Sequence, residues 1–159
     1  MKLNKFIFED KAREWKLEET NFNRLTLLVG ASGVGKTQIL KAIHALREVA
    51  LGESVNGIKW FADFNIGSEK HYTWEGEFEK LDTNPFVADE DEEESVKNKP
   101  ELLFERITYN NEVIAERTVD KILFQGKETI KLSREKSLVN HLKEESEMSS
   151  IISEMKRIH

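Results

Sequence analysis

Hydrophobic side chains near the N-terminus predict strands in the first 30 residues. Residues 2–8 are rich in aromatic and aliphatic side chains. Residues 15–17 either extend this strand or form a partner to it, in which case a hairpin turn falls around residues 9–13. Residues 24–29 form an almost continuous apolar run that ends at Gly30. Such runs are typical of strands that are covered on both faces, as in a parallel sheet.

A helical pattern follows over residues 36–50. Its apolar positions recur at the spacing of one helix face, and Gly52 is a suitable helix end. These apolar positions are Ile39, Leu40, Ile43, Leu46 and Val49.

The middle of the chain changes to a two-residue period. Tyr72, Trp74 and Phe78 share one parity, as expected for a half-buried antiparallel strand. Asn110-Asn111 and Gln125-Gly126 occur where hairpin turns are expected. The predicted strands cover residues 58–66, 71–80, 102–109, 113–119, 122–124 and 129–132, an acidic loop covers 82–100, and short helices cover 138–142 and 149–158.

Composition narrows the class of protein. The chain has 159 residues, 24 Lys and Arg, 30 Asp and Glu, a net charge of −6 and no cysteine. This length suits one domain, and the acidic balance argues against a protein that coats nucleic acid. The lack of cysteine excludes disulfides and thiolate metal sites. No long apolar stretch or signal-peptide core is present, so we expect a cytoplasmic protein without a membrane span.

One motif carries strong chemical information. It follows an apolar run and opens the predicted helix, which is the context that a phosphate-binding loop requires. The motif matches the pattern G-x-x-x-x-G-K-[ST] through Gly30, Ala31, Ser32, Gly33, Val34, Gly35, Lys36 and Thr37.

Phosphate binding explains these residue types. Gly30, Gly33 and Gly35 allow the backbone to approach a phosphate closely, so that successive N–H groups and the helix N-terminus face the anion. The Lys36 ammonium can reach the β- and γ-phosphates and is the candidate catalytic group, while the Thr37 hydroxyl can bind Mg²⁺. The alternative is a glycine-rich strand-to-helix turn that holds no ligand.

Hydrolysis requires more than this loop. A carboxylate at the end of an apolar strand normally supports the metal, and the nearest imitation is residues 86–90, which run directly into further acidic residues. Only residues 24–29 and the helix after them fit a parallel strand with a crossover helix. We therefore expect the first part of a larger ATPase head.

The order of the motifs resembles a known family. A first strand, a Trp-bearing second strand, residues 23–29, the loop and residues 38–43 together resemble the ABC-type ATPase heads of the SMC/RecF/OLD group. The chain is most similar to the small AAA-family ATPases of that group found in bacterial antiphage systems and DNA repair. The resemblance covers residues 1–50 and extends more weakly to residue 132.

This resemblance implies a site and a mechanism. In that family two heads enclose two ATP molecules, and each phosphate loop faces a signature Ser-Gly motif of the other head. Gly30 to Thr37 would hold ATP and Mg²⁺, with Gln38 at the edge of the site and Lys11 or Arg13 near the nucleotide. The signature motif, metal-site Asp, catalytic Glu and switch His of the family are not identified in this chain, which puts autonomous hydrolysis in doubt.

The expected fold class is therefore α/β. An N-terminal P-loop NTPase lobe, similar to an ABC ATPase, would carry a mainly antiparallel β subdomain and form an incomplete head. The expected domains are a strand-loop-helix core over residues 1–57, an antiparallel lobe over 58–132 and a helical segment over 133–159.

Three functions compete. The first is an ATP-binding segment whose nucleotide-driven head dimerisation controls a nuclease or another DNA-directed or defence effector, with nucleic acid in the full assembly and no membrane. The second is a nucleotide-binding regulatory or assembly module without its own hydrolysis. The third is a small phosphotransferase, which predicts an Arg-rich lid and parallel strands that the sequence does not show. No Asn-Lys-x-Asp segment is present, which favours adenine over guanine.

Other candidate groups have simpler interpretations. The four histidines lack metal-site spacing, and the aromatic residues of the middle segment are expected in the core. Lys127, Lys131, Arg134 and Lys136 alternate with acidic residues, which is typical of a solvated face.

Overall fold

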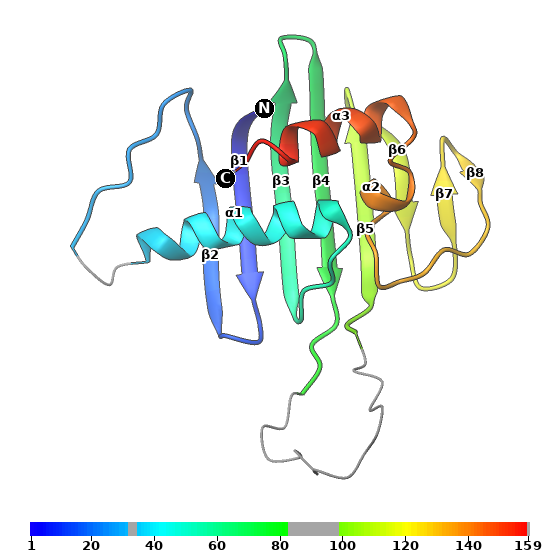
Figure 1. Cartoon of the computed structure of the whole chain (residues 1–159), viewed down its shortest axis with the longest axis horizontal. Coiled ribbons are helices and arrows are strands. Elements are labelled where there is room, and N and C mark those ends of the chain that lie inside the picture. Colours follow the sequence, from blue (N-terminus) through cyan, green and yellow to red (C-terminus); the bar gives the residue numbers. More distant parts are fainter. Residues whose placement is uncertain (32–34, 83–98, 159) are drawn as a thin grey trace.

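The fold is built on one antiparallel sheet. The computed structural model describes residues 1–31, 35–82 and 99–158, and eight strands within them form a single sheet in the order β2-β1-β3-β4-β5-β6-β7-β8 (Figure 1). The strands are β1 (Lys2–Asp10), β2 (Trp15–Asn21), β3 (Ile58–Ile66), β4 (Lys70–Phe78), β5 (Leu102–Tyr109), β6 (Glu112–Arg117), β7 (Ile122–Phe124) and β8 (Lys127–Glu128).

Short turns set the register of this sheet. Asn110 and Asn111 join β5 to β6 with φ angles of 47° and 68°, and Gln125 and Gly126 join β7 to β8 with φ angles of 49° and 73°. Two successive positive φ angles match the right-handed twist of a tight hairpin, and Asn and Gly tolerate them best. Both predicted turns are confirmed.

In the part of the chain that the structure describes, three helices cover one face of the sheet: α1 (Lys36–Leu51), α2 (Leu138–His141) and α3 (Ser146–Met155) (Figure 1). Helix α1 ends where Gly52 adopts φ 104°, and the Gly52 N–H bonds to the carbonyls of Glu48 and Val49. The predicted helices are therefore present, with bounds shifted by up to three residues.

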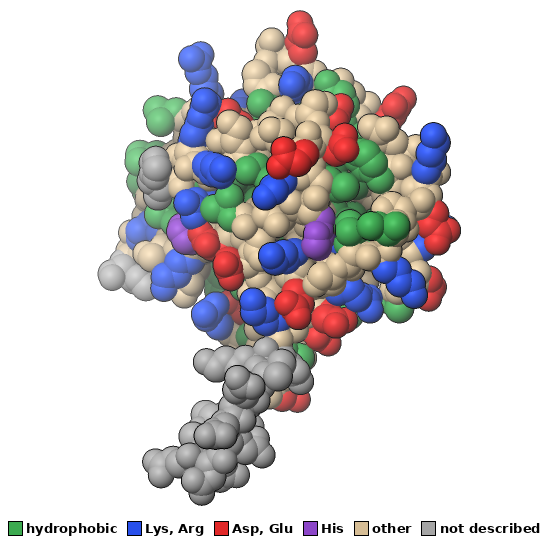
Figure 2. Space-filling model, turned by 45° about the vertical axis from the view of Figure 1, so that its right-hand side comes forward, with side chains coloured by type: hydrophobic (Ala, Val, Ile, Leu, Met, Phe, Trp, Pro, Cys, Tyr) green, Lys and Arg blue, Asp and Glu red, His purple; other side chains and the backbone are tan. Residues whose placement is uncertain are grey.

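Figure 2 shows Lys and Arg side chains interspersed with Asp and Glu over one face of the molecule.

The core lies between the sheet and these helices. Phe64, Tyr72 and Trp74 are fully buried, and the rings of Trp60 and Trp74 meet edge to face at 5.4 Å. Aromatic residues at these strand positions bury large apolar areas, which stabilises the layer contact. The prediction that the middle aromatic residues form core is confirmed for these four, whereas Phe61 stays partly exposed.

The expected α/β fold class is wrong. All strand pairs are antiparallel, so the described residues form one open antiparallel sheet with helices on one side and no parallel P-loop core. The parallel sheet was predicted from the apolar run at residues 24–29 and from the helix after it. An apolar run shows that a segment is hydrophobic. It does not show which strand, if any, the segment pairs with, because that depends on residues far away in the sequence.

Residues 24–29 do not form the predicted strand. The chain leaves the sheet after β2 and returns to it at α1, and Leu25, Leu27 and Val29 are 89%, 80% and 77% exposed (Figure 1). The segment has no strand neighbour among the described residues. The strand predicted at residues 129–132 is also wrong, because the short β8 ends at Glu128 and Ile130 is exposed.

Two further expectations concern a membrane span and the acidic loop. None of its helices is both long and apolar enough to cross a lipid bilayer. The acidic run and the imitation of a metal-site strand at residues 86–90 lie outside the described residues.

Candidate functional site

The predicted phosphate loop joins the exposed segment 24–29 to helix α1. Gly30, Ala31, Gly35, Lys36, Thr37 and Gln38 belong to the described residues, and Ser32, Gly33 and Val34 lie outside them. Gly35 has φ 92°, a backbone conformation that glycine adopts at little cost. A side chain at Gly35 would meet no atom within 4 Å, so conformation rather than space favours glycine there.

The first turn of α1 leaves its N-terminus suited to an anion. Gly35 is the N-cap residue and provides no side-chain cap, and its carbonyl accepts hydrogen bonds from the Gln38 and Ile39 N–H groups at 2.9 and 3.3 Å. No acidic residue occupies the first turn, and the Thr37 side chain is exposed. The partial positive charge of the helix end is therefore not neutralised by a local carboxylate.

Lys36 folds back over the loop that precedes it. Its ammonium donates hydrogen bonds to the carbonyl oxygens of Gly30 at 2.6 Å and Ala31 at 2.5 Å. This contact places the predicted catalytic cation against the beginning of the motif. A bound phosphate would compete for the same ammonium protons with oxygens that carry more negative charge.

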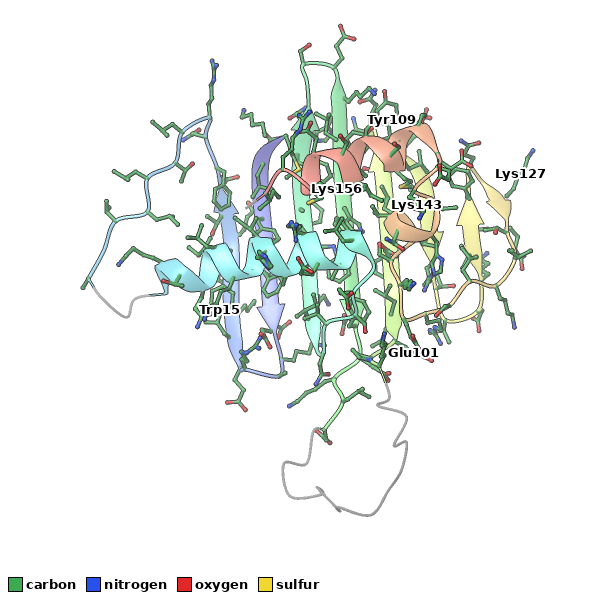
Figure 3. The ribbon with its side chains drawn as sticks, in the orientation of Figure 1. Trp15, Glu101, Tyr109, Lys127, Lys143 and Lys156 are labelled. Atoms are coloured by element: carbon green, nitrogen blue, oxygen red, sulfur yellow. The ribbon has the colours of Figure 1, made fainter. Side chains whose placement is uncertain are left out.

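A groove of about 510 Å³ runs along α1 beside this loop. We call it the α1 groove. It lies between α1 and the β1–β2 hairpin, and Figure 3 shows Trp15 of that hairpin next to the N-terminal half of the helix. Gln38 belongs both to the predicted site and to the groove, and Lys41 lines the groove one turn after Thr37. The residues that line the groove are Phe8, Asp10, Arg13, Trp15, Gln38, Lys41, Ala42, His44, Ala45, Glu48, Val55 and Ile58.

The β1–β2 turn sets the charge of the α1 groove. Asp10 is buried, and its carboxylate accepts hydrogen bonds from the Arg13 guanidinium at 2.7 Å and from the Arg13 backbone N–H at 2.9 Å. Lys11 instead points to Glu77, and this hydrogen bond raises the pKa of Lys11. Of the two basic residues predicted near the nucleotide, Arg13 therefore lines the groove and Lys11 is held elsewhere.

The described part of the chain offers few ligands for a metal. Within the described residues there is no group of three or more His, Asp or Glu side chains close enough to hold an ion. Thr37 remains the predicted Mg²⁺ ligand. A single hydroxyl can serve in this way because Mg²⁺ keeps several waters and is shared between the phosphate-loop Ser or Thr and the phosphates of the nucleotide.

Sequence reasoning missed Trp15, Asp10 and Lys41 as members of this site. Asp10 has the same strand parity as Phe8, which is a signal for an inward carboxylate. Lys41 lies four residues after Thr37, which places both on one side of the helix. The position of Trp15 depends on how the hairpin packs against α1, and the strand pattern alone does not contain that contact.

No protein-family model, curated protein or solved structure matches this chain. The resemblance to ABC-type ATPase heads therefore stays a prediction that rests on the sequence motif, since the parallel core expected around the motif is not formed.

Proposed function

We propose that this protein binds a nucleoside triphosphate, with ATP preferred, together with Mg²⁺ through residues 30–38. One observation carries the proposal: the complete phosphate-loop motif leads directly into α1, whose first turn holds Lys36 and Thr37 and no acidic residue. This combination of a cation, a hydroxyl and an uncompensated helix N-terminus suits a polyphosphate with its metal ion.

Magnitudes support binding at the loop. A hydrogen bond to a charged group contributes about 1.5–3 kcal/mol, and the helix terminus adds about 0.3–1 kcal/mol. Three such contacts and the helix terminus together give about 5–10 kcal/mol, which is comparable to the roughly 4–8 kcal/mol of a millimolar to micromolar complex. Further contacts, such as backbone N–H groups of the loop, are needed to offset the cost of association. Lys36 exchanges its two carbonyl contacts for phosphate oxygens when the ligand binds.

The α1 groove gives room for the nucleoside end of the ligand. It starts at Gln38, next to the predicted metal ligand, and Trp15 offers an aromatic surface beside the helix. The groove is open to solvent and carries Arg13 and Lys41, so ribose and base can enter it without burying an unpaired cation. These features favour a nucleotide over inorganic polyphosphate as the ligand.

We propose that nucleotide occupancy controls association with a second copy of this chain. Leu25, Leu27 and Val29 are exposed directly before the loop, and contiguous exposed apolar side chains are typical of interaction surfaces. A nucleotide bound at residues 30–38 would fix the position of the apolar segment directly before them. In this role the chain acts as a nucleotide-dependent assembly module, and hydrolysis requires catalytic groups that the described residues do not present.

The test is a titration with ATP, GTP and tripolyphosphate in the presence of Mg²⁺, followed by calorimetry. We expect a saturable ATP signal that weakens about tenfold or more in Lys36→Ala, because one charged hydrogen bond of about 1.5 kcal/mol corresponds to a factor of ten. Thr37→Ala should weaken ATP binding only when Mg²⁺ is present. Lys143→Ala is the matched control, since Lys143 is an exposed lysine after α2 (Figure 3).

Equal ATP affinity in the wild type and in Lys36→Ala would contradict the proposed site. Equal affinity for tripolyphosphate and ATP would remove the nucleoside from the proposal. Light scattering with and without ATP tests the association, and a mass that is unchanged at saturating ATP would refute that part.

A further inference from the structure

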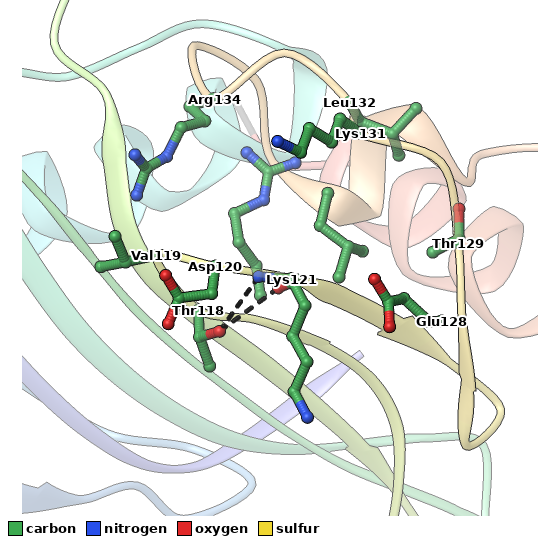
Figure 4. A pocket seen from close by; sticks show the side chains of 11 residues that line it. Thr118, Val119, Asp120, Lys121, Glu128, Thr129, Lys131, Leu132 and Arg134 are labelled. Atoms are coloured by element: carbon green, nitrogen blue, oxygen red, sulfur yellow. Dashed lines mark hydrogen bonds between the residues drawn. The ribbon is translucent and has the colours of Figure 1, made fainter.

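A second cavity lies at the other end of the sheet from the phosphate loop. It is formed by the β6–β7 turn and by the segment after β8, and its volume is about 230 Å³ (Figure 4). We call it the Arg117 pocket. Four basic and two acidic side chains line it, which leaves two positive charges in excess in a chain whose net charge is −6. These charged residues are Arg117, Lys121, Lys131, Arg134, Asp120 and Glu128.

Arg117 is the unusual member of this set. It is the last residue of β6 and is only 1% exposed. One guanidinium nitrogen, Nη1, donates to the Ser133 carbonyl at 2.9 Å. The Nε and Nη2 atoms are buried and have no hydrogen-bond partner. Buried polar groups are normally satisfied, so each unpaired donor here costs free energy that a ligand can recover.

The acidic residue that faces Arg117 across β5 and β6 does not satisfy it. Glu105 is the register partner of Arg117 across β5 and β6, but its carboxylate accepts from the Trp74 indole N–H at 2.9 Å, the Leu138 N–H at 2.7 Å and the Ser137 hydroxyl. Burial raises the pKa of Glu105, which favours its neutral form. Burial also lowers the pKa of Arg117. Glu105 therefore compensates the positive charge of the buried Arg117 guanidinium only in part.

Arg134 provides a second set of unused donors at the same pocket. Its Nη1 atom lies 3.6 Å from a carboxylate oxygen of Glu101, while Nε and Nη2 are buried without a partner. Figure 4 shows Arg134 and Lys131 on the same side of the pocket, with Lys121 extending in the opposite direction. Arg117 and Arg134 thus both line one small cavity, and each has buried N–H donors without a partner. Lys131 lines the same cavity and is exposed.

We propose that the Arg117 pocket binds a phosphate-class oxyanion through Arg117 and Arg134, with Lys131 at the entrance. Guanidinium groups form strong paired hydrogen bonds with phosphate oxygens. Donors that come from three different side chains suit a tetrahedral anion, which has acceptor oxygens in several directions. The site is independent of the nucleotide proposal, because residues 117–134 lie at the β8 end of the sheet, whereas residues 24–31 and the start of α1 lie at its β2 end (Figure 1).

The test is a titration of the ¹⁵N-labelled full chain with inorganic phosphate at constant ionic strength, followed by amide NMR spectra. We expect saturable shifts of the amides of residues 118–121 and 128–134, separate from those of residues 30–38. Arg134→Gln and Lys131→Gln should each raise the midpoint about tenfold, as expected for loss of one charged contact. Lys131 is exposed, so its substitution keeps the test valid even where Arg134→Gln perturbs folding.

Two variants separate this site from other causes. Lys127→Gln removes an exposed lysine of β8 that does not line the pocket and should leave the midpoint unchanged (Figure 3). Lys36→Ala should abolish only the shifts near the phosphate loop, so failure of the nucleotide proposal remains distinguishable. Shifts that do not saturate, or that weaken equally in Lys127→Gln and Lys131→Gln, would overturn the pocket proposal.

Further titrants identify the source of the anion. A short oligothymidylate presents phosphodiesters, so tighter saturation of the same amides would assign a nucleic-acid backbone. Saturation by inorganic phosphate without a response to the oligonucleotide would assign a free phosphate or a phosphomonoester. Acetate that matches phosphate in midpoint would overturn the phosphate class.

Discussion

Gly76 on β4 lies against the indole ring of Trp60, its register partner on β3. A Cβ atom at Gly76 would stand 2.5 and 2.6 Å from Cζ2 and Cη2 of that ring and 3.1 Å from the Phe104 carbonyl oxygen. The ring is held by Trp74 at 5.4 Å and Phe78 at 6.0 Å between centroids. Space for the Trp60 side chain therefore depends on the absence of a side chain at Gly76.

We expect Gly76→Ala to destabilise the protein by about 1–3 kcal/mol, because overfilling a packed core displaces its neighbours. Urea unfolding followed by tryptophan fluorescence measures this loss. In a Trp60→Phe background the smaller ring leaves room, so the penalty of Gly76→Ala should shrink. An identical penalty in both backgrounds would show that the two residues do not interact.

Glu105 makes stability depend on pH in an uncommon direction. Burial raises its folded-state pKa above the ordinary value of 4.5, although three hydrogen bonds act against this shift. The folded protein therefore holds the Glu105 proton more tightly than the unfolded chain does. The resulting stabilisation is complete below pH 4.5 and is lost as the pH rises through the raised pKa.

Glu105→Gln imitates the protonated side chain and should remove this dependence. We expect the unfolding free energy of the wild type, minus that of the variant, to fall as the pH rises above 4.5. Urea titrations from about pH 4 to about pH 8, a range that spans the titration, measure the difference. A difference that rises with pH would mean that the ionised carboxylate is the form stabilised by the fold.

Glu77 should show the opposite sign. Burial favours its neutral form, but hydrogen bonds from Lys11 and Lys59 outweigh burial and lower the pKa of Glu77. Its stabilisation is present above pH 4.5 and is lost as the pH falls through the lowered pKa. Glu77→Gln should cost about 1 kcal/mol or less near neutral pH, since the pair is partly exposed, and nothing in strong acid. A cost that persists in strong acid would point to packing instead of charge.

Much of the secondary structure could be predicted from local sequence. The strands at 58–66, 102–109 and 122–124 and the turns at Asn110-Asn111 and Gln125-Gly126 are present at the predicted positions. Two-residue alternation and turn residues are local signals, so strands and turns can be predicted from them without knowledge of the fold. The expected parallel core failed because it depended on which strands become neighbours.

The charged core residues show a second limit. Glu105 shares strand parity with buried Ile107, and Arg117 shares parity with buried Ala115, so both lie in the inward row that also holds Gly76 and Trp60. Parity alone would have indicated two inward charges. The prediction of a solvated face is confirmed for Lys127, Lys131 and Lys136, which are exposed, whereas Arg134 is half-buried and lines the Arg117 pocket together with Lys131. That cavity forms where residues 117–122 and 128–134 come together, and the hydrophobic pattern of either segment alone does not predict their contact.

Leu27 and Leu46 offer a matched test of the exposed segment before the phosphate loop. Leu27 is 80% exposed and Leu46 of α1 is 3% exposed. Because an exposed side chain loses few contacts on truncation, Leu27→Ala should change the unfolding free energy of the isolated chain by no more than about 0.5 kcal/mol. Leu46→Ala should cost about 2–5 kcal/mol, since it leaves a cavity under the helix. If Leu27→Ala destabilised the monomer as much as Leu46→Ala does, residues 24–29 would have to pack against the rest of the chain.

The same Leu27→Ala variant tests the proposed association of two copies. If ATP brings two chains together at residues 24–29, loss of the exposed leucine removes apolar contact area from the dimer and should weaken it. Sedimentation at saturating ATP measures this weakening. Lys143→Ala, which changes an exposed residue after α2, is the control and should leave the dimer unchanged. Equal weakening in both variants would place the interface elsewhere, because the apolar segment would then have no specific part in the contact.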